Sequence, residues 1–288
     1  MYYDDNTVVY LNGEWLKAQS AKVGLYQQSF HYGNGVFEGI RSYQTPTGPK
    51  VWHAKAHYER LLYSAKTMHI SIPYAVDELV ELTYELLEKN QLGDAYIRPL
   101  LYTSENMGLQ IDDEAHLFMC AWDWGSYFGE KPLHLVTSQY SRPDPDSCHV
   151  EAKVTGHYAN SLLAMKAAKQ QGFDDALLLD KNGHVAEATG ANVFIQKGDA
   201  LLTPKTGHLL PGITRQIVMD LCHSMGISCQ EATLSLADVL AADAAFLTGT
   251  AVEIKGVTSL DAQVFPMPWS DSLGATIHQQ FNQKVRAA

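Results

Sequence analysis

A single lysine, Lys153, stands in a mostly uncharged stretch just before residues 158–170, whose spacing predicts a helix. In a desolvated pocket a lysine has a lowered pKa, because burial disfavours the charged ammonium. The neutral amine can then attack an aldehyde and form a Schiff base. A lone lysine before a helix is usually a solvated surface residue, so this chemistry depends on what other segments place beside Lys153.

Residues 209–215 form a second motif, in which Pro211 and Gly212 lead into another predicted helix. The first amides of a helix have no partner within it and carry the positive end of its dipole. The amides of Ile213 and Thr214 are therefore candidates for binding a phosphate. An ordinary capped helix start is the alternative interpretation.

Glu187 and Thr250 lie in two further short motifs of small residues. Glu187 is flanked by alanines at the end of a predicted hairpin strand, and a buried carboxylate there needs a partner such as a protonated pyridine nitrogen. Thr250 follows Gly249, which lets a backbone approach a ligand closely while the threonine offers a hydroxyl. A solvent-facing acid and a simple tight turn are the respective alternatives.

His53 and His57 stand four residues apart on a predicted helix, a spacing that also occurs in metal sites. No third ligand of suitable type lies in an obvious frame with them, so no metal site is expected.

The elements that must position these residues are strands with helices outside them. Strands are expected over residues 8–10, 15–16, 35–43, 95–103, 116–124, 133–138, 174–180, 184–188, 191–196 and 244–247, and helices over 53–68, 76–89, 158–170, 213–225 and 270–285. No βαβ alternation runs through the chain, which favours an α+β fold over a doubly wound sheet. We expect a small N-terminal α+β domain over 1–125, an interdomain loop over 126–132 and a larger domain over 133–288 that carries Lys153.

Composition narrows the classes of function. The 288 residues are 46% hydrophobic and carry a formal charge of −11, which argues against general nucleic-acid binding. The four cysteines form no CxxC pair, so reduced thiols are expected. The first residues lack the features of a signal peptide, and no apolar run is long enough for a membrane span. A cytoplasmic enzyme or binding protein is expected.

Together, the order and spacing of these motifs resemble the fold-type IV family of pyridoxal-phosphate enzymes, and most of all the branched-chain amino acid aminotransferases. The resemblance spans nearly the whole chain. It is carried by His31-Tyr32-Gly33, Val36-Phe37-Glu38-Gly39-Ile40-Arg41, Tyr96-Ile97-Arg98-Pro99-Leu100, Ala152-Lys153 with Tyr158, Glu187 with Gly190, Leu210-Pro211-Gly212-Ile213-Thr214-Arg215 and Gly249-Thr250-Ala251. The implied architecture is the two-domain fold of D-amino acid aminotransferase-like proteins.

The resemblance also implies a role for each cofactor residue. Lys153 would form the Schiff base with pyridoxal phosphate and then carry the proton between the substrate α-carbon and C4′ of the cofactor. Glu187 would pair with the pyridine nitrogen, and Tyr158 would bind the phenolic oxygen. The phosphate would be held by Arg60, the amides of Ile213 and Thr214, and Thr250.

On the substrate side, the family's aromatic pocket would accept leucine, isoleucine or valine. Its members here would be Tyr32, Phe37, Tyr96, Trp124 and Tyr127. Arg98 would receive the distal carboxylate of glutamate or 2-oxoglutarate, and Tyr96 with the backbone of Thr250 and Ala251 would bind the α-carboxylate.

The same resemblance shows two positions at which this chain differs from relatives, and it implies a homodimer. Leu109 stands where relatives often carry valine, in a loop that would reach the substrate pocket of the neighbouring subunit, so a homodimer is implied. Ala191 stands where some relatives carry an acid.

The leading hypothesis is therefore an L-amino acid transaminase that works by a ping-pong scheme, moving the amino group of a branched-chain amino acid to 2-oxoglutarate. A D-amino acid or (R)-amine transaminase, or an aminodeoxychorismate lyase, shares the cofactor residues and is the alternative. A non-catalytic phosphate-ligand or cofactor carrier is a third possibility, against which the joint presence of Lys153, Tyr158 and Glu187 speaks.

Overall fold

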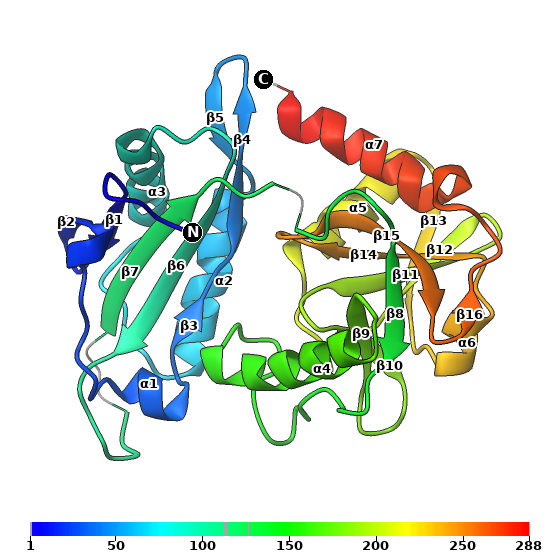
Figure 1. The fold of residues 1–288 in the computed structure, drawn as a ribbon, viewed down its shortest axis with the longest axis horizontal. Coiled ribbons are helices and arrows are strands. Elements are labelled where there is room, and N and C mark those ends of the chain that lie inside the picture. The colour runs from blue at the N-terminus through cyan, green and yellow to red at the C-terminus, as the bar shows by residue number, and fades with distance from the viewer. Residues whose placement is uncertain (1, 112–114, 126, 288) are drawn as a thin grey trace. The chain divides into compact units, whose positions relative to one another are not determined.

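The computed structural model describes residues 2–111, 115–125 and 127–287. The chain divides into two compact units (Figure 1). The N-terminal unit contains residues 1–125, 152–157 and 286–288, and the C-terminal unit contains residues 126–151 and 158–285. Each unit is built around its own β-sheet.

The N-terminal unit contains a seven-stranded sheet in which neighbouring strands run antiparallel. Its strands are β1 (Val8–Leu11), β2 (Glu14–Lys17), β3 (Val36–Phe37), β4 (Ile40–Thr45), β5 (Gly48–Val51), β6 (Ala95–Thr103) and β7 (Ala115–Trp122). They lie in the order β2-β1-β7-β6-β4-β5, and β3 also pairs with β6. Asn12 and Gly13 form the turn of the β1–β2 hairpin, and both residues have the positive φ that this turn requires.

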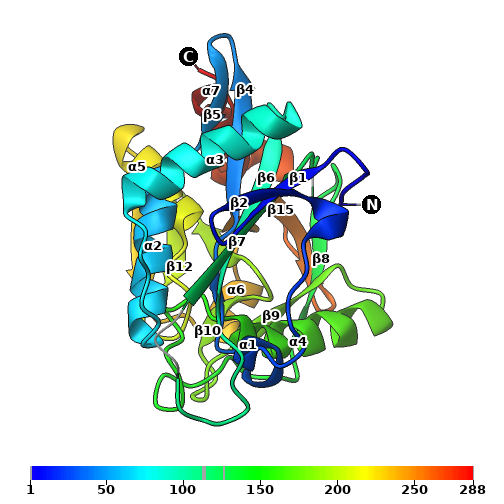
Figure 2. The ribbon, with the colours of Figure 1, turned by 90° about the vertical axis from the view of Figure 1, so that its left-hand side faces the viewer.

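Two helices, α2 (Ala54–Thr67) and α3 (Val76–Asn90), cover one face of this sheet (Figure 2). Their apolar residues recur every three or four positions, so Leu61 and Leu86 reach the same core as Ile97 of β6 and Met119 of β7. The other helices of the unit are α1 (Gln28–Tyr32) and the 3-10 turns η1 (Ala18–Ser20) and η2 (Thr155–His157).

The C-terminal unit contains a nine-stranded mixed sheet in the order β10-β9-β8-β15-β14-β11-β12-β13, with β16 beside β15. Its strands are β8 (Leu133–Thr137), β9 (Asp175–Leu179), β10 (Val185–Ala188), β11 (Asn192–Lys197), β12 (Ala200–Pro204), β13 (Ser228–Ala232), β14 (Ala244–Gly249), β15 (Glu253–Leu260) and β16 (Gln263–Val264). Its helices are α4 (Tyr158–Gln170), α5 (Ile213–Ser224), α6 (Leu236–Leu240) and α7 (Leu273–Arg286), with the 3-10 turn η3 (Trp269–Asp271).

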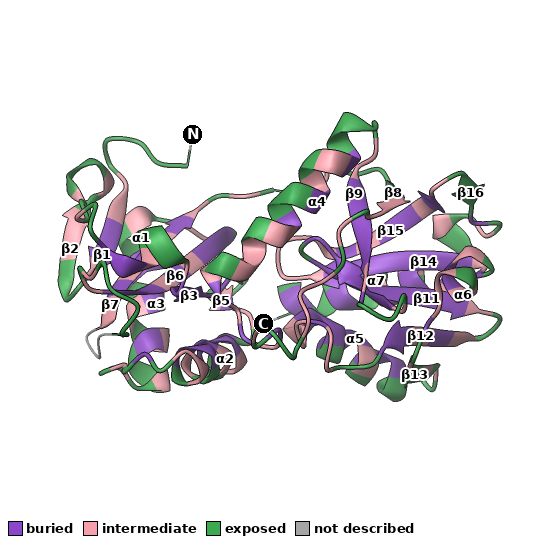
Figure 3. Ribbon diagram, turned by 90° about the horizontal axis from the view of Figure 1, so that it is seen from below, coloured by how far each residue is buried: buried purple, intermediate pink, exposed green. Residues whose placement is uncertain are grey.

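Parallel pairing in this sheet follows from its connections. Helix α4 joins β8 to the parallel β9, and α5 joins β12 to the parallel β13, as parallel neighbours require a crossover. The central strands are buried almost throughout (Figure 3). The fold is α+β, as predicted, although two local βαβ units occur within it.

The segment that carries Lys153 differs from the prediction. A domain over 133–288 was expected to carry it, but residues 152–157 belong to the N-terminal unit. The amides of Thr155 and Gly156 donate to the carbonyls of Gly35 and Gly33, each at 2.8 Å. A Cβ on Gly33 would come within 2.8 Å of the Gly156 backbone, so only glycine allows this approach. Residue 126, in the predicted loop 126–132, lies outside the described residues.

Among the helices of the described ranges, none is long and apolar enough to cross a membrane.

Asp175 gives the C-terminal unit a specific pH dependence. It is 1% exposed at the start of β9, where its carboxyl accepts hydrogen bonds from Thr189 Oγ1 (2.6 Å) and the Ala176 amide (2.7 Å). Burial raises the pKa of Asp175 to about 6. Because the folded state prefers the neutral acid, the stability it contributes is complete below about pH 4 and is lost as pH rises through about 6.

We therefore predict that the free energy of unfolding of the wild type, relative to Asp175→Asn, falls by about 2 kcal/mol between pH 4 and pH 7. Denaturant unfolding of both proteins across this range measures the difference. A difference that stayed constant with pH, or grew, would contradict the assignment.

Candidate active site

The backbone of Lys153 is held on both sides by the N-terminal unit. Its amide donates to Ser64 Oγ on α2 at 2.9 Å, and its carbonyl accepts from the Phe37 amide on β3 at 3.1 Å. Its Nζ lies 4.9 Å from the centroid of the Phe37 ring. The lysine predicted to do chemistry is therefore fixed in place between a helix and a strand.

The same phenyl ring also meets Arg98, the predicted carboxylate-binding cation. Arg98 Cζ lies 4.7 Å from the Phe37 centroid and 5.4 Å from that of Tyr96, whose hydroxyl accepts a hydrogen bond from Arg98 Nη2 at 3.3 Å. Arg98 Nε is buried and, among the described residues, has no hydrogen-bond partner. Leaving a buried donor unpaired costs free energy, which a ligand with acceptor oxygens would recover. Lys153, Phe37, Tyr96 and Arg98 thus form one cluster.

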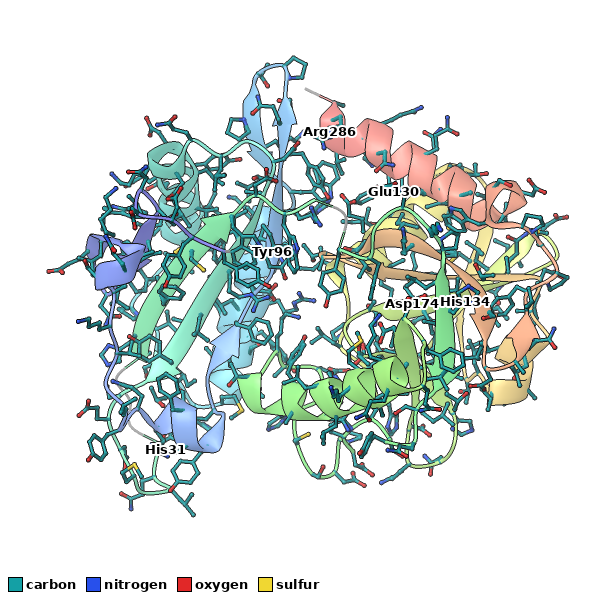
Figure 4. The ribbon with its side chains drawn as sticks, in the orientation of Figure 1. His31, Tyr96, Glu130, His134, Asp174 and Arg286 are labelled. Atoms are coloured by element: carbon teal, nitrogen blue, oxygen red, sulfur yellow. The ribbon has the colours of Figure 1, made fainter. Side chains whose placement is uncertain are left out.

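Tyr96, labelled in Figure 4, is surrounded closely by its neighbours. Its ring lies perpendicular to that of Trp124 at 4.7 Å, and its hydroxyl would be 1.9 Å from a Cβ built on Gly39. Arg41 donates to the carbonyls of Trp124 and Gly125 at 3.0 and 3.2 Å, which anchors this aromatic segment. Any residue larger than glycine at position 39 would displace Tyr96.

Arg60, a predicted phosphate ligand, lies on α2 with its guanidinium against Glu38. Arg60 Nε and Nη2 donate to the two Glu38 oxygens at 2.6 and 2.9 Å, and His57 Nδ1 lies 2.8 Å from Oε2. No role was predicted for Glu38. His57 was expected to share a helix with His53, but α2 begins after His53, which has a positive φ of 50°.

Tyr32 and Leu109 belong to a more exposed part of this unit. The Tyr32 hydroxyl donates to the Met107 carbonyl at 2.9 Å, which ties α1 to the loop that carries Leu109. The exposed fraction is 47% for Tyr32 and 82% for Leu109 in the single chain.

In the C-terminal unit, Glu187 is a buried anion with three donors. It is 6% exposed, and its oxygens accept from Arg142 Nε at 2.5 Å, Asn192 Nδ2 at 3.1 Å and the Leu210 amide at 3.2 Å. A carboxylate offers about four acceptor sites, so beyond these donors from the described residues Glu187 could accept one more. Neither Arg142 nor Asn192 was predicted to take part. Arg142 lies in a loop with no periodic pattern, so only its charge could have suggested it.

The amides of Ile213 and Thr214, which were predicted to bind an anion, lie in the first turn of α5. Its N-cap residue is Gly212, and among the described residues no side chain caps this helix start. A Cβ on Gly212 would lie 2.0 Å from Asn192 Oδ1, so glycine is required there as well.

The remaining predicted residues stand at element ends of the same unit. Tyr158 begins α4, and Thr250 and Ala251 directly follow β14. Just before them, Thr248 Oγ1 is fully buried and lacks a hydrogen-bond partner among the described residues. The ring of Tyr127 lies 4.6 Å from that of Phe128. Among the described residues, no group of three or more His, Cys, Asp or Glu is placed to hold a metal ion.

The ion pair of Arg142 with Glu187 is expected to matter for stability. Both side chains are less than 10% exposed, so removing the arginine leaves a buried charge without its main partner. We predict that Arg142→Ala lowers the free energy of unfolding by about 3–5 kcal/mol. Lys181→Ala is the control, because Lys181 is 47% exposed where it pairs with Asp146; it should cost about 1 kcal/mol or less. Equal losses in the two variants would contradict this.

Comparisons with known proteins identify the family of this chain. A family model described as amino-transferase class IV matches residues 35–260. The branched-chain-amino-acid aminotransferase of Pseudomonas aeruginosa is 38% identical over 266 residues, which cover 90% of this chain and 87% of that protein.

Solved structures agree as well. The branched-chain aminotransferase of Thermoproteus uzoniensis, crystallised with norvaline, matches with a TM-score of 0.93 and 32% identity, covering 97% of this chain and 94% of that one. The branched-chain amino acid aminotransferase of Thermobaculum terrenum, in its PLP-bound form, matches with a TM-score of 0.93 and 27% identity, covering 99% and 95%. The chain therefore belongs to the class IV aminotransferase family and, within it, to the branched-chain amino acid aminotransferases.

Proposed function

We propose that the protein transfers the amino group of L-leucine, L-isoleucine or L-valine to 2-oxoglutarate, giving L-glutamate and a branched-chain 2-oxo acid. The reaction depends on pyridoxal phosphate and is reversible. The observation that carries the proposal is the cluster in which Lys153 and Arg98 share the Phe37 ring, in a chain of this family. The amine that would form the Schiff base and the guanidinium that would bind the distal carboxylate of the substrate lie in one unit of the protein.

The residues present fit the cofactor. Counting the donors in the described ranges, Glu187 has an acceptor site left for a protonated ring nitrogen, and no described side chain caps the start of α5. Bound pyridoxal phosphate supplies a conjugated ring that takes up electrons when a bond at the substrate α-carbon breaks. Lys153 Nζ is the amine that would hold the cofactor covalently and would carry the proton to and from the α-carbon.

The other cofactor residues would hold and orient it. Glu187 would keep the ring nitrogen protonated, and the Tyr158 hydroxyl would bind the phenolic oxygen. Arg60, the amides of Ile213 and Thr214, and the hydroxyl of Thr250 would bind the phosphate. Because the protein is acidic overall, these local donors, and not a general positive charge, must bind the anionic phosphate.

Substrate binding must accept an apolar side chain in one half-reaction and a charged one in the other. Phe37, Tyr96, Tyr32, Trp124 and Tyr127 supply the apolar surface. Arg98 binds the distal carboxylate, which its unpaired Nε and its position on aromatic rings support. The α-carboxylate is bound by Tyr96 and the backbone of Thr250 and Ala251. Another branched-chain amino acid aminotransferase of known structure, 32% identical to this chain, was crystallised with N-(5'-phosphopyridoxyl)-L-glutamate, which fits glutamate as the second substrate.

The proposal includes a homodimer in which Leu109 reaches the substrate site of the neighbouring subunit. Apolar side chains on α1 and the loops at 23–26 and 107–111 support it, because large exposed apolar patches mark interfaces. They are Val23, Leu25, Tyr26, Phe30, Met107, Leu109 and Ile111, each at least 38% exposed. Beside Phe30 lies a mainly apolar cavity of about 360 Å³. All four cysteines are free thiols, which suits the proposed cytoplasmic location.

Lys153→Ala should abolish amino transfer, because no other group would hold the cofactor covalently or carry the α-proton. We expect formation of L-glutamate from L-leucine and 2-oxoglutarate to fall by at least about a thousandfold. Lys166→Ala, which removes an exposed lysine on α4, serves as the control and should keep wild-type activity. Comparable activity in the two variants would contradict the proposal.

Arg98→Met should separate the two half-reactions. Losing a charge-assisted contact to the distal carboxylate should lower kcat/KM for L-glutamate by roughly 10- to 100-fold. L-leucine has no such carboxylate, so its kcat/KM should change by less than about threefold. Single-turnover kinetics with each amino acid measure both values. Equal losses for the two donors would exclude Arg98 as the distal carboxylate ligand.

A further inference from the structure

Glu38 is a fully buried acid whose carboxylate faces the guanidinium of Arg60. The side chain of Glu38 is 0% exposed and that of Arg60 is 11% exposed. Arg60 Nε donates to Oε1 at 2.6 Å and Arg60 Nη2 donates to Oε2 at 2.9 Å. One edge of the guanidinium therefore makes a bidentate pair with the two carboxylate oxygens. This fork geometry fixes the plane of the guanidinium as well as its position.

The pair is ionic and its charges balance one to one. Burial alone would raise the pKa of Glu38, but the Arg60 guanidinium and His57 hold it well below its ordinary value. Burial lowers the pKa of His57, against the opposing effect of Glu38, so the imidazole is neutral near pH 7 and its Nδ1–H donates to Glu38 Oε2. Arg60 is therefore the counter-ion of Glu38, and His57 adds a neutral hydrogen bond.

The same backbone elements carry this pair and Lys153. Glu38 directly follows Phe37, whose amide donates to the Lys153 carbonyl, and the Glu38 amide donates to the Pro99 carbonyl at 3.0 Å. On α2, Arg60 and Ser64 are four residues apart and face the same side, where Ser64 Oγ accepts from the Lys153 amide. The Glu38–Arg60 pair thus ties the guanidinium to the strand and helix that fix the lysine.

Stability alone is a weak reason for such a pair. Desolvating two charges costs about as much as their attraction returns, and well-packed apolar residues often stabilise a fold equally well. A fixed guanidinium has another use, because an arginine side chain that is ordered before binding loses less entropy when it binds a phosphate.

We propose that Glu38 is a positioning residue that holds Arg60 in the orientation that binds the phosphate of pyridoxal phosphate. The inference rests on the proposed function, because Arg60 is a phosphate ligand only if the protein binds this cofactor.

The test compares binding of pyridoxal phosphate with binding of pyridoxal, which lacks the phosphate. Apparent Kd values are measured by quenching of tryptophan fluorescence in the full-length protein, which has five tryptophans. In Glu38→Gln the Kd for pyridoxal phosphate should rise at least about tenfold, while that for pyridoxal should change less than about threefold. The preference for the phosphorylated ligand, and not binding in general, is the quantity that Glu38 should control.

Three further variants make the test specific. In an Arg60→Ala background, adding Glu38→Gln should change the preference no further, because Glu38 acts through Arg60. His57→Gln removes a second side-chain contact of Glu38 and should keep the wild-type preference to within about threefold. If Glu38→Gln fails to fold, Glu38→Asp takes its place: it keeps the charge but shortens the side chain, so the preference should again fall.

A Glu38 variant that folds and keeps the wild-type preference would overturn the inference. An equal rise in the Kd values for pyridoxal phosphate and pyridoxal would also overturn it, because a purely structural role would weaken binding of both ligands alike. If the wild type itself binds no pyridoxal phosphate, the proposed function fails first and the inference fails with it.

Discussion

The hydrogen bond from the Phe37 amide to the Lys153 carbonyl is the interaction on which the site in the N-terminal unit depends. It makes Lys153 a neighbour of β3, although Phe37 and Lys153 are 116 positions apart in the chain. The ring of Phe37 then lies beside the amine of Lys153 and the guanidinium of Arg98. The close approach of Gly33 and Gly156 permits this arrangement, because a side chain at either position would push the two backbones apart.

The C-terminal unit also holds a buried charged side chain. Glu187 is buried with Arg142, Asn192 and the Leu210 amide around it, so the anion is stabilised before any ligand arrives. Asn192 also donates to the Leu210 carbonyl and lies against Gly212, the residue before α5. One asparagine therefore links the buried carboxylate to the helix start that suits a phosphate. Both units use the same principle, in which buried charges are fixed by several short polar contacts.

The sequence predicted the elements whose residues repeat regularly. Residues 95–103 and 158–170 are a strand and a helix with the predicted bounds. The strand β13 was missed because its residues are mostly exposed and show no alternation. The strands β5, β12, β15 and β16 and the short helices α1 and α6 were also missed.

The sequence could not show which distant charges meet. The folded backbone brings together Glu38 with Arg60, and Arg142 with Glu187. Local sequence patterns cannot predict such pairs, because the partners are far apart in the sequence. For the same reason the Lys153 segment was assigned to the wrong unit: its contacts are made with residues 33–37, far away in the chain. The candidate residues came from a family resemblance, while their supporting partners had to come from the structure.

The most direct measurement of the central claim is half-reaction spectroscopy of the wild type loaded with pyridoxal phosphate. L-leucine, D-alanine and an (R)-amine are each added without an oxo acid, and the visible absorbance of the bound cofactor is followed. If Lys153 serves a branched-chain amino acid aminotransferase, L-leucine removes this absorbance and 2-oxoglutarate restores it. A protein that responds to D-alanine or the amine but not to L-leucine, or to none of the three, would contradict the claim.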